Sequence, residues 1–312
     1  MHQKIASAFS PGGISSFFEI CDTGQNGKPL SKLEEIGARG GGFVINRGVH
    51  TCVEVTEKKK SNVQVFINGK LAPEAETSRS VANSLLAETK EEYGITISHT
   101  VAIPIGAGFG SSAGGAMGTA LALSKVLGLR LTYNQLGRIA HVAEIKCKTG
   151  LGTVGPIMLG GCILTVAAGA PGIGVVDRIP LSEEYSVVAG FLGPTPTKRI
   201  LASAERRRGV NMWGRITLES ILAEPSVENF LACCLKFAEE TGFMTEGVKK
   251  LAHLAIGAGA VGAAQNMVGE AVHALVLDEN AGRVAEAFKK LLPKDRIIVA
   301  KIDFQGARLI SQ

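Results

Sequence analysis

Hydrophobic positions in the first seventy residues form short runs rich in β-branched and aromatic side chains, which predicts strands. The predicted strands span residues 5–9, 17–22, 43–56 and 63–67. Asn68-Gly69 follows the last run and is typical of a tight turn. Residues 74–93 then show the helical period and stop at Gly94, and residues 95–103 return to a strand pattern. The nearly all-apolar stretch 113–127 predicts a buried helix.

The rest of the chain mixes the same two patterns. Thr132 and Gln135 have the spacing of a capping box, and the apolar stripe after them predicts a helix that ends near Cys147. Further strands are predicted at 160–167, 173–179, 186–191 and 296–304, and further helices at 226–241, 246–255, 265–277 and 281–292. Because both halves contain strands and helices, we expect an α+β protein whose two domains divide between residues 155 and 195.

Charge and composition narrow the classes of partner. The 312 residues carry a formal net charge of +5, and the basic runs Lys58–Lys60 and Arg206–Arg208 are short enough to be solvated turns. We therefore expect no nucleic-acid partner, whereas a weakly positive field suits an anionic small molecule. The uncharged segments 101–124 and 155–176 are interrupted by proline and glycine, so neither predicts a membrane span.

The cysteines and the first residues bear on location. Six cysteines lack C-x-x-C spacing, which favours reduced thiols, and the first residues lack the apolar stretch of a signal peptide. Both features predict a cytoplasmic protein. The sequence allows a homodimer but does not determine the oligomeric state.

The segment from Pro104 to Gly115 carries the clearest chemical signal. It joins a predicted strand to a predicted helix, and its glycines let the backbone approach a ligand closely. Ser111 and Ser112 lie where unpaired N–H groups and the helix dipole favour a bound phosphate. Simple N-capping would explain one serine but not the glycines before it. The segment therefore predicts the phosphate cradle of a small-molecule kinase.

Other phosphate motifs fit less well. No Lys-Ser or Lys-Thr pair follows the glycines, which excludes a Walker A loop. Gly108-x-Gly110-x-x-Ala113 and Gly257-x-Gly259-x-x-Gly262 match a dinucleotide fingerprint. The first lacks an acidic residue about twenty positions on, and the second follows a predicted helix instead of a strand. A nicotinamide-dependent enzyme is therefore the weaker alternative.

Longer motifs now indicate a family. Pro104-x-x-x-Gly108-Phe-Gly110-Ser111-Ser112-Ala113 resembles the P-x-x-x-G-L-G-S-S-A motif of the galactokinase, homoserine, mevalonate and phosphomevalonate (GHMP) kinase superfamily. Residues 8–14 are similar to its N-terminal A-P-G-K-V element, and residues 257–273 lie where its third glycine-rich motif occurs. The archaeal pantoate kinase branch is the most similar, through residues 11–20, 38–49, 141–154, 265–276 and 301–309.

This resemblance implies a fold and a set of roles. The implied fold is an N-terminal nucleotide-binding domain over residues 1–165, like domain 2 of ribosomal protein S5, and a ferredoxin-like C-terminal domain over 166–312. ATP and Mg²⁺ are the implied cofactors, with Ser112 and Glu144 as catalytic and metal-binding residues. The implied nucleotide-binding residues are Pro104, Gly106, Ala107, Gly108, Phe109, Gly110, Ser111, Ser112 and Ala113.

Two residues of the family pattern are absent. Gly13 stands at the position of the N-terminal lysine, and the aspartate that acts as base in mevalonate-type enzymes falls near Thr153. We therefore expect direct attack by the substrate hydroxyl, oriented by Thr153, because positioning and electrostatic stabilisation supply most of the catalysis of phosphoryl transfer.

The acceptor implied by the resemblance is pantoate, an anionic hydroxy acid, which ATP-dependent phosphorylation converts to 4-phosphopantoate, a step toward coenzyme A. Arg39 is the candidate for its carboxylate, with Arg47 and Lys198-Arg199 as alternatives. The polar groups of Ser10, Gly12, Ser15 and Ser16 are expected to hold the rest of the acceptor. A homoserine-type kinase and a non-catalytic metabolite sensor on the same fold are also compatible with these residues.

Overall fold

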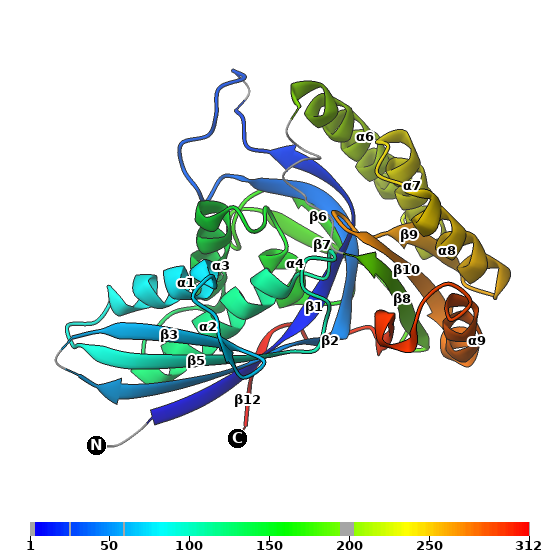
Figure 1. The fold of residues 1–312 in the computed structure, drawn as a ribbon. Coiled ribbons are helices and arrows are strands. Elements are labelled where there is room, and N and C mark those ends of the chain that lie inside the picture. The colour runs from blue at the N-terminus through cyan, green and yellow to red at the C-terminus, as the bar shows by residue number, and fades with distance from the viewer. Residues whose placement is uncertain (1–3, 25, 59, 194–202, 312) are drawn as a thin grey trace.

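The computed structural model describes residues 4–24, 26–58, 60–193 and 203–311. Two long strands, β1 (Lys4–Cys21) and β2 (Gly37–Glu57), run antiparallel along most of the molecule (Figure 1). Their register runs from Lys4 opposite Val55 to Cys21 opposite Gly37. The two strands predicted at 5–9 and 17–22 are therefore one continuous strand.

The first sheet is built around this pair. Its strand order is β12-β1-β2-β5-β3-β4, and β6 also pairs with β2 and continues to β7. The remaining strands of this sheet are β3 (Asn62–Ile67), β4 (Lys70–Leu71), β5 (Tyr93–Val101), β6 (Cys162–Ala167), β7 (Val175–Ile179) and β12 (Arg308–Ile310). The strand β3 is parallel to β5, and the chain crosses between them through the first helix.

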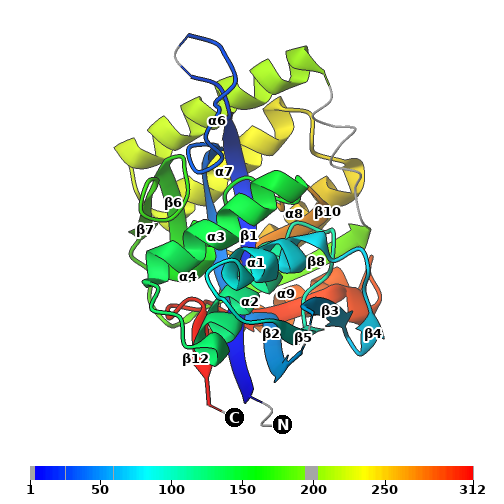
Figure 2. The same cartoon turned by 90° about the vertical axis from the view of Figure 1, so that its left-hand side faces the viewer.

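One face of this sheet is covered by helices α1 (Glu76–Leu86), α2 (Ser111–Leu127), α3 (Tyr133–Cys147) and α4 (Val154–Leu159) (Figure 2). Helix α2 is buried along nearly its whole length, as its apolar sequence predicted. The capping box at the start of α3 is confirmed, because Thr132 and Gln135 bond each other's backbone N–H groups. Within the described residues, no helix combines the length and the apolar character needed to cross a bilayer.

The second sheet has the order β11-β8-β10-β9, with every neighbour antiparallel. Its strands are β8 (Tyr185–Gly193), β9 (Gly262–Gln265), β10 (Glu270–Leu277) and β11 (Ile297–Lys301). Helices α6 (Ala204–Ala223), α7 (Val227–Glu240) and α8 (Glu246–Gly257) separate β8 from β9, whereas α9 (Asp278–Phe288) and the short turn η1 (Lys294–Arg296) precede β11. Chain order and sheet order together are those of a ferredoxin-like unit with extra helices in its first crossover.

Two predictions in this region were wrong. Residues 265–277 form β9, a turn and β10, not a helix. Strand β10 is buried on both faces from Ala271 to Val276, so the alternation that marks a half-exposed strand is missing from its sequence. The basic run Arg206–Arg208, interpreted as a solvated turn, lies in helix α6, which the sequence analysis did not predict.

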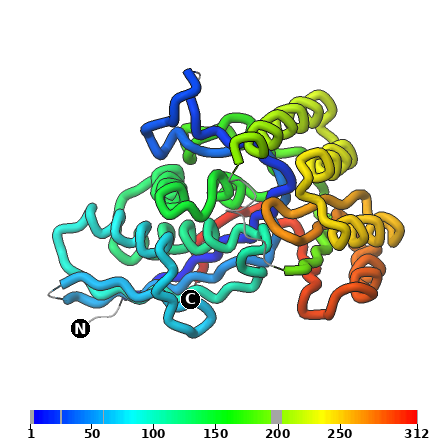
Figure 3. Tube along the Cα trace, turned by 45° about the horizontal axis from the view of Figure 1, so that its top comes forward, coloured from blue at the N-terminus to red at the C-terminus, as the bar shows by residue number. Residues whose placement is uncertain are grey.

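The two sheets share a core. Phe17 and Phe43, on β1 and β2, contact Phe230 of α7 with ring centroids 6.1 Å and 5.3 Å apart. The tube in Figure 3 shows the helices of the second half against one side of the β1–β2 pair and those of the first half against the other. The boundary at residue 165 stays a prediction. Strands β7 and β12 follow that residue in the chain but belong to the first sheet.

Candidate functional site

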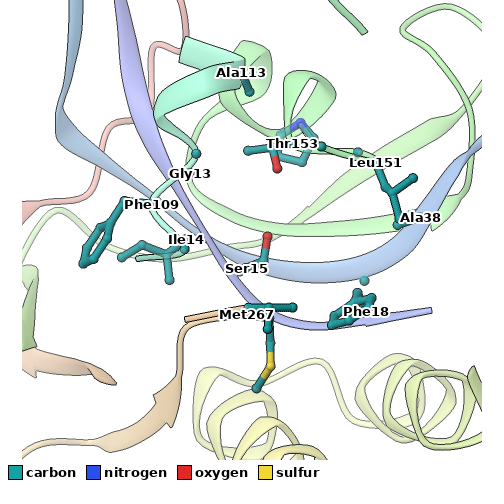
Figure 4. A pocket seen from close by; sticks show the side chains of 18 of the residues that line it. Gly13, Ile14, Ser15, Phe18, Ala38, Phe109, Ala113, Leu151, Thr153 and Met267 are labelled. Atoms are coloured by element: carbon teal, nitrogen blue, oxygen red, sulfur yellow. The ribbon is translucent and has the colours of Figure 1, made fainter. Parts of the chain in front are cut away.

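A cavity of about 400 Å³ lies where the two halves meet along β1 and β2. It is lined by these strands, by the segment before α2, by residues 149–153 after α3 and by the β9–β10 turn. Figure 4 shows Ala113 and Thr153 on one side of the cavity and Phe18 and Met267 on the other, with the Ser15 hydroxyl between them. Segments more than 150 residues apart in the chain therefore build one site.

The predicted phosphate cradle forms one end of the cavity. Helix α2 begins at Ser111, and its N-cap is Gly110, which adopts φ +70° and offers no side-chain cap. Neither serine is the N-cap, so the capping alternative does not account for them. The first backbone N–H groups of α2 therefore have no partner from a capping side chain, and they face the cavity together with the positive end of the helix dipole.

The cradle is held by close backbone packing. The Gly13 N–H donates to the carbonyl of Phe109 at 3.0 Å, and the Met267 N–H donates to the carbonyl of Ser15 at 2.6 Å. A Cβ on Gly13 would lie 2.7 Å from the Ile157 side chain and 2.8 Å from Cγ2 of Thr153. No side chain, and so no lysine, fits at residue 13 without a shift of its neighbours.

Glu144 of α3 faces the cavity beside Ser112 and is only 2% exposed. Its carboxylate accepts a hydrogen bond from the Thr149 hydroxyl at 2.9 Å. Burial raises the pKa of Glu144, and hydrogen bonds from the Ser112 and Thr149 hydroxyls oppose that shift. No basic side chain pairs with Glu144 within the described part of the chain.

This donor set fits Mg²⁺. A buried carboxylate without a protein cation is costly, and a bound metal ion would offset its charge. Mg²⁺ prefers one or two protein oxygen ligands together with water and phosphate oxygens. The Ser112 hydroxyl and the Glu144 carboxylate are oxygen groups of this kind and would hold such an ion, whereas the described residues contain no cluster of three or more His, Cys, Asp and Glu side chains that would form an all-protein metal site.

Two threonines that the sequence analysis gave no role complete this end of the site. The Thr77 hydroxyl, at the start of α1, lies 3.0 Å from the Thr149 hydroxyl and 3.5 Å from the Ser112 hydroxyl. Thr149 in turn bonds Glu144. Thr77 is 72 residues from Thr149 and sits in an ordinary helical pattern, so nothing in the sequence marks it.

The predicted nucleotide-binding residues come together, with two exceptions. Gly106, Gly108, Phe109, Gly110 and the residues up to Ala113 line the cavity, as does Thr153. Pro104 and Ala107 do not. Ala107 is buried, and its backbone packs against Gly269 of the β9–β10 turn.

Of the residues predicted to bind the acceptor, some line the cavity and others do not. Ser15 and Arg39 line the cavity, whereas Ser10, Gly12 and Ser16 do not. Ser10 is buried near Gly118 of α2, Gly12 packs against the backbone of residue 47, and the Ser16 hydroxyl bonds Nε2 of His273 at 2.9 Å. Strand alternation fits Ser15 and Ser16, which point to opposite faces of the sheet. It does not hold around the register shifts of β1, since the consecutive residues Gly13, Ile14 and Ser15 all line the cavity.

The alternatives to Arg39 are not in the cavity. Arg47 is exposed outside it. Lys198 and Arg199 lie outside the described residues. Arg39 is itself paired, because its Nε donates to Glu19 at 2.7 Å and its Nη2 contacts the same carboxylate oxygen. Apart from Arg39 and Glu144, the lining residues in the described part of the chain are uncharged, and Phe18, Leu151, Ile163 and Met267 give much of it an apolar surface.

Two buried histidines support the site. Thr51 and Ser78 hold His99 beneath α2, and Ser16 and Asn266 hold His273 beneath the β9–β10 turn, each through contacts of 2.9 Å. Burial lowers the pKa of His99 to about 4 and that of His273 to about 3. Both side chains are therefore neutral at pH 7.

This burial predicts a pH-dependent stability. Below about pH 6.5 the unfolded chain binds protons that the folded chain does not, so the free energy of unfolding falls as pH drops toward 4. Each histidine should lower the free energy of unfolding by about 2 kcal/mol between pH 7.5 and pH 5. Urea unfolding at both pH values tests this. His99→Gln should show a smaller pH-dependent loss than the wild type, and an unchanged loss would contradict the assignment.

Comparison with known proteins identifies the family. Residues 76–161 match the family GHMP kinases N terminal domain. The chain is 32% identical over 295 residues to pantoate kinase from Thermococcus kodakarensis, which covers 92% of this chain and 93% of that protein. The chain belongs to the pantoate kinase family of GHMP kinases. Pantoate kinase from Methanocaldococcus jannaschii is 30% identical over 262 residues, covering 84% of this chain and 89% of that protein.

A solved structure described as a phosphotransferase related to the CoA biosynthesis pathway superposes with a TM-score of 0.86 at 28% identity, covering 98% of each chain. The predicted GHMP kinase fold is thereby confirmed. The nicotinamide alternative is not favoured. Gly257 is the last residue of helix α8, and Gly262 opens strand β9, which is the reverse of the strand-to-helix order that a dinucleotide fingerprint requires.

Proposed function

We propose that this chain transfers the γ-phosphoryl group of ATP to the 4-hydroxyl of pantoate and forms 4-phosphopantoate. The relatives named pantoate kinase and the fold they share support this proposal. The observation that carries it is the uncapped start of α2, which lies beside Glu144 in a cavity that Arg39 also lines. One cavity therefore contains N–H groups that can bind phosphate, a carboxylate that can hold a metal ion and a cation that can bind the carboxylate of the acceptor.

The chain's own groups account for most of the chemistry. Backbone N–H groups at Ser111, Ser112 and Ala113 bind the terminal phosphates and stabilise the charge of the transferring group. Mg²⁺, when bound by Ser112 and Glu144, neutralises phosphate charge. The cavity holds no carboxylate besides Glu144 within the described residues, so the acceptor hydroxyl attacks the γ-phosphorus directly as the bond to ADP breaks. Its proton leaves late, to an oxygen of the transferred phosphoryl group, as a loose transition state allows. Thr153 orients that hydroxyl.

The acceptor end fits a hydroxy acid better than an amino acid. Arg39 supplies a positive charge for a carboxylate, and the apolar surface at Phe18 and Leu151 suits the dimethyl branch of pantoate. The ammonium group of homoserine would need an acidic partner, but Glu144 is at the phosphate end and Glu19 is bound to Arg39. The free thiols of the six cysteines fit the cytoplasm as the place of this reaction.

The direct test is ADP release measured with ATP and a panel of pantoate, homoserine and mevalonate, with and without Mg²⁺. The proposal expects Mg²⁺-dependent turnover that is fastest with pantoate. Preference for homoserine would favour the homoserine-type alternative. Binding of ATP and pantoate by calorimetry without ADP release would favour a metabolite sensor.

Arg39→Ala should raise the KM for pantoate by on the order of tenfold to a hundredfold, because a charge-assisted hydrogen bond is worth about 1.5–3 kcal/mol. The KM for ATP should change by less than about twofold. Arg47→Ala is the matched control, since Arg47 is exposed outside the cavity. Equal changes in both KM values for Arg39→Ala would argue against contact with the acceptor.

A further inference from the structure

Arg39 belongs to a cluster that reaches outside the cavity. Glu19 and Arg39 lie directly opposite each other on β1 and β2, and their side chains form an ion pair. The Glu19 side chain is 7% exposed, so its charge needs a partner. Its second carboxylate oxygen accepts from Nη2 of Arg215 at 3.3 Å, and Arg215 lies on helix α6 and does not line the cavity.

Helix α6 is anchored to the end of β1 by residues at helical spacing. Arg207 donates to both carboxylate oxygens of Asp22 at 2.7 Å. Asn211 accepts from the backbone N–H of Ile20 at 2.9 Å and donates to its carbonyl at 3.1 Å. Arg215 is the next member of the same stripe. Figure 1 shows α6 beside this end of the β1–β2 pair. The helix therefore has anchors that do not depend on Arg215.

The net charge of the cluster formed by Glu19, Arg39 and Arg215 affects how the acceptor can bind. With Glu19 shared by two arginines, one positive charge is left uncompensated beside the cavity. Glu19 also occupies the Nε side of the Arg39 guanidinium, which leaves the edge that contains Nη1 for a ligand. Without Arg215, Glu19 would offset the charge of Arg39, which is the one basic side chain of the described lining.

We propose that Arg215 is a positioning residue for acceptor binding. Arg215 and Arg39 both interact with the Glu19 carboxylate, so Glu19 does not fully offset the charge of Arg39, which stays available to the carboxylate of the substrate. This inference rests on the proposed function. Arg215 acts through Glu19 and Arg39 without touching the acceptor. Its effect is electrostatic, so it should appear in the affinity for the acid and weaken as salt screens the charges.

The test compares Arg215→Gln with Arg207→Gln and Arg215→Lys in steady-state assays with pantoate and Mg-ATP. Arg207 is the matched control, because it makes an ion pair from the same helix to the same strand end but does not reach Arg39. Arg215→Gln should raise the KM for pantoate about threefold to tenfold at low ionic strength. The kcat and the KM for ATP should change by less than about twofold, and the KM difference should shrink in about 0.5 M salt.

Arg215→Lys should restore most of the affinity, and Arg207→Gln should behave as the wild type. Equal KM values for pantoate in the two glutamine variants, or equal changes in the KM values for pantoate and ATP, would overturn the inference while leaving the proposed function intact. A wild-type protein that releases no ADP with pantoate would overturn the proposed function and the inference with it.

Discussion

Replacing Glu144 with glutamine should lower kcat by about a hundredfold to a thousandfold, which is the range for loss of one preorganised electrostatic group. Glutamine keeps the shape of the side chain but removes the charge that offsets a divalent cation. Ser112→Ala removes the neighbouring oxygen ligand and should have an effect of similar size. The rate of ADP release at saturating ATP and pantoate measures both.

A second readout separates this role from a structural one. Mg²⁺ should strengthen ATP binding to the wild-type protein in calorimetry but change little for Glu144→Gln. The variant should unfold at the same temperature or higher, because it no longer buries a charged carboxylate without a basic partner. Glu239→Gln, an exposed site on α7, is the control. Near-normal turnover of Glu144→Gln and Ser112→Ala would contradict the assigned metal site.

Gly110→Ala should weaken ATP binding by at least about a hundredfold. The residue adopts φ +70°, and a Cβ there would lie 2.8 Å from Cγ2 of Thr153 and 3.0 Å from the carbonyl oxygen of Gly13. Relief of these contacts must shift the first turn of α2, and with it the N–H groups that bind phosphate. Calorimetric titration with ATP measures the loss.

Gly128→Ala is a close control for this variant. Gly128 follows the other end of α2, has φ +68°, and has open space where a Cβ would stand. Both substitutions carry the backbone strain of a left-handed residue, about 1–2 kcal/mol, so both should lower stability. Only Gly110→Ala should lose ATP affinity. Equal affinity in the two variants would show that the start of α2 does not bind the nucleotide.

Local signals in the sequence predicted the parts of this molecule whose structure depends on near neighbours. The glycine loop, the buried helix α2 and the capping box of α3 each follow from residues within one or two turns of chain. The β9–β10 hairpin was missed because burial on both faces removes alternation. Helix α6 was missed because its first turns are polar and basic, and contacts with β1 help to hold it.

The candidate site likewise has one part that local motifs predicted and another part that depends on contacts between distant residues. Ser112, Glu144 and Thr153 were predicted from motifs, and the fold brings them to one cavity. The acceptor end depends on contacts across long separations, such as Glu19 with Arg215, 196 residues apart. The sequence also could not show which face of β1 each residue occupies around the register shifts near Gly12 and Ser16. It therefore did not separate Ser15, which lines the cavity, from Ser10, Gly12 and Ser16, which do not.

The measurement that tests the central claim most directly is a crystal structure of the protein with Mg²⁺, a non-hydrolysable ATP analogue and pantoate. The account predicts the terminal phosphate at the backbone N–H groups of Ser111 to Ala113, the metal ion between that phosphate and Glu144, and the pantoate carboxylate at Arg39. A nucleotide bound elsewhere, with the start of α2 unchanged and free of phosphate, would contradict it.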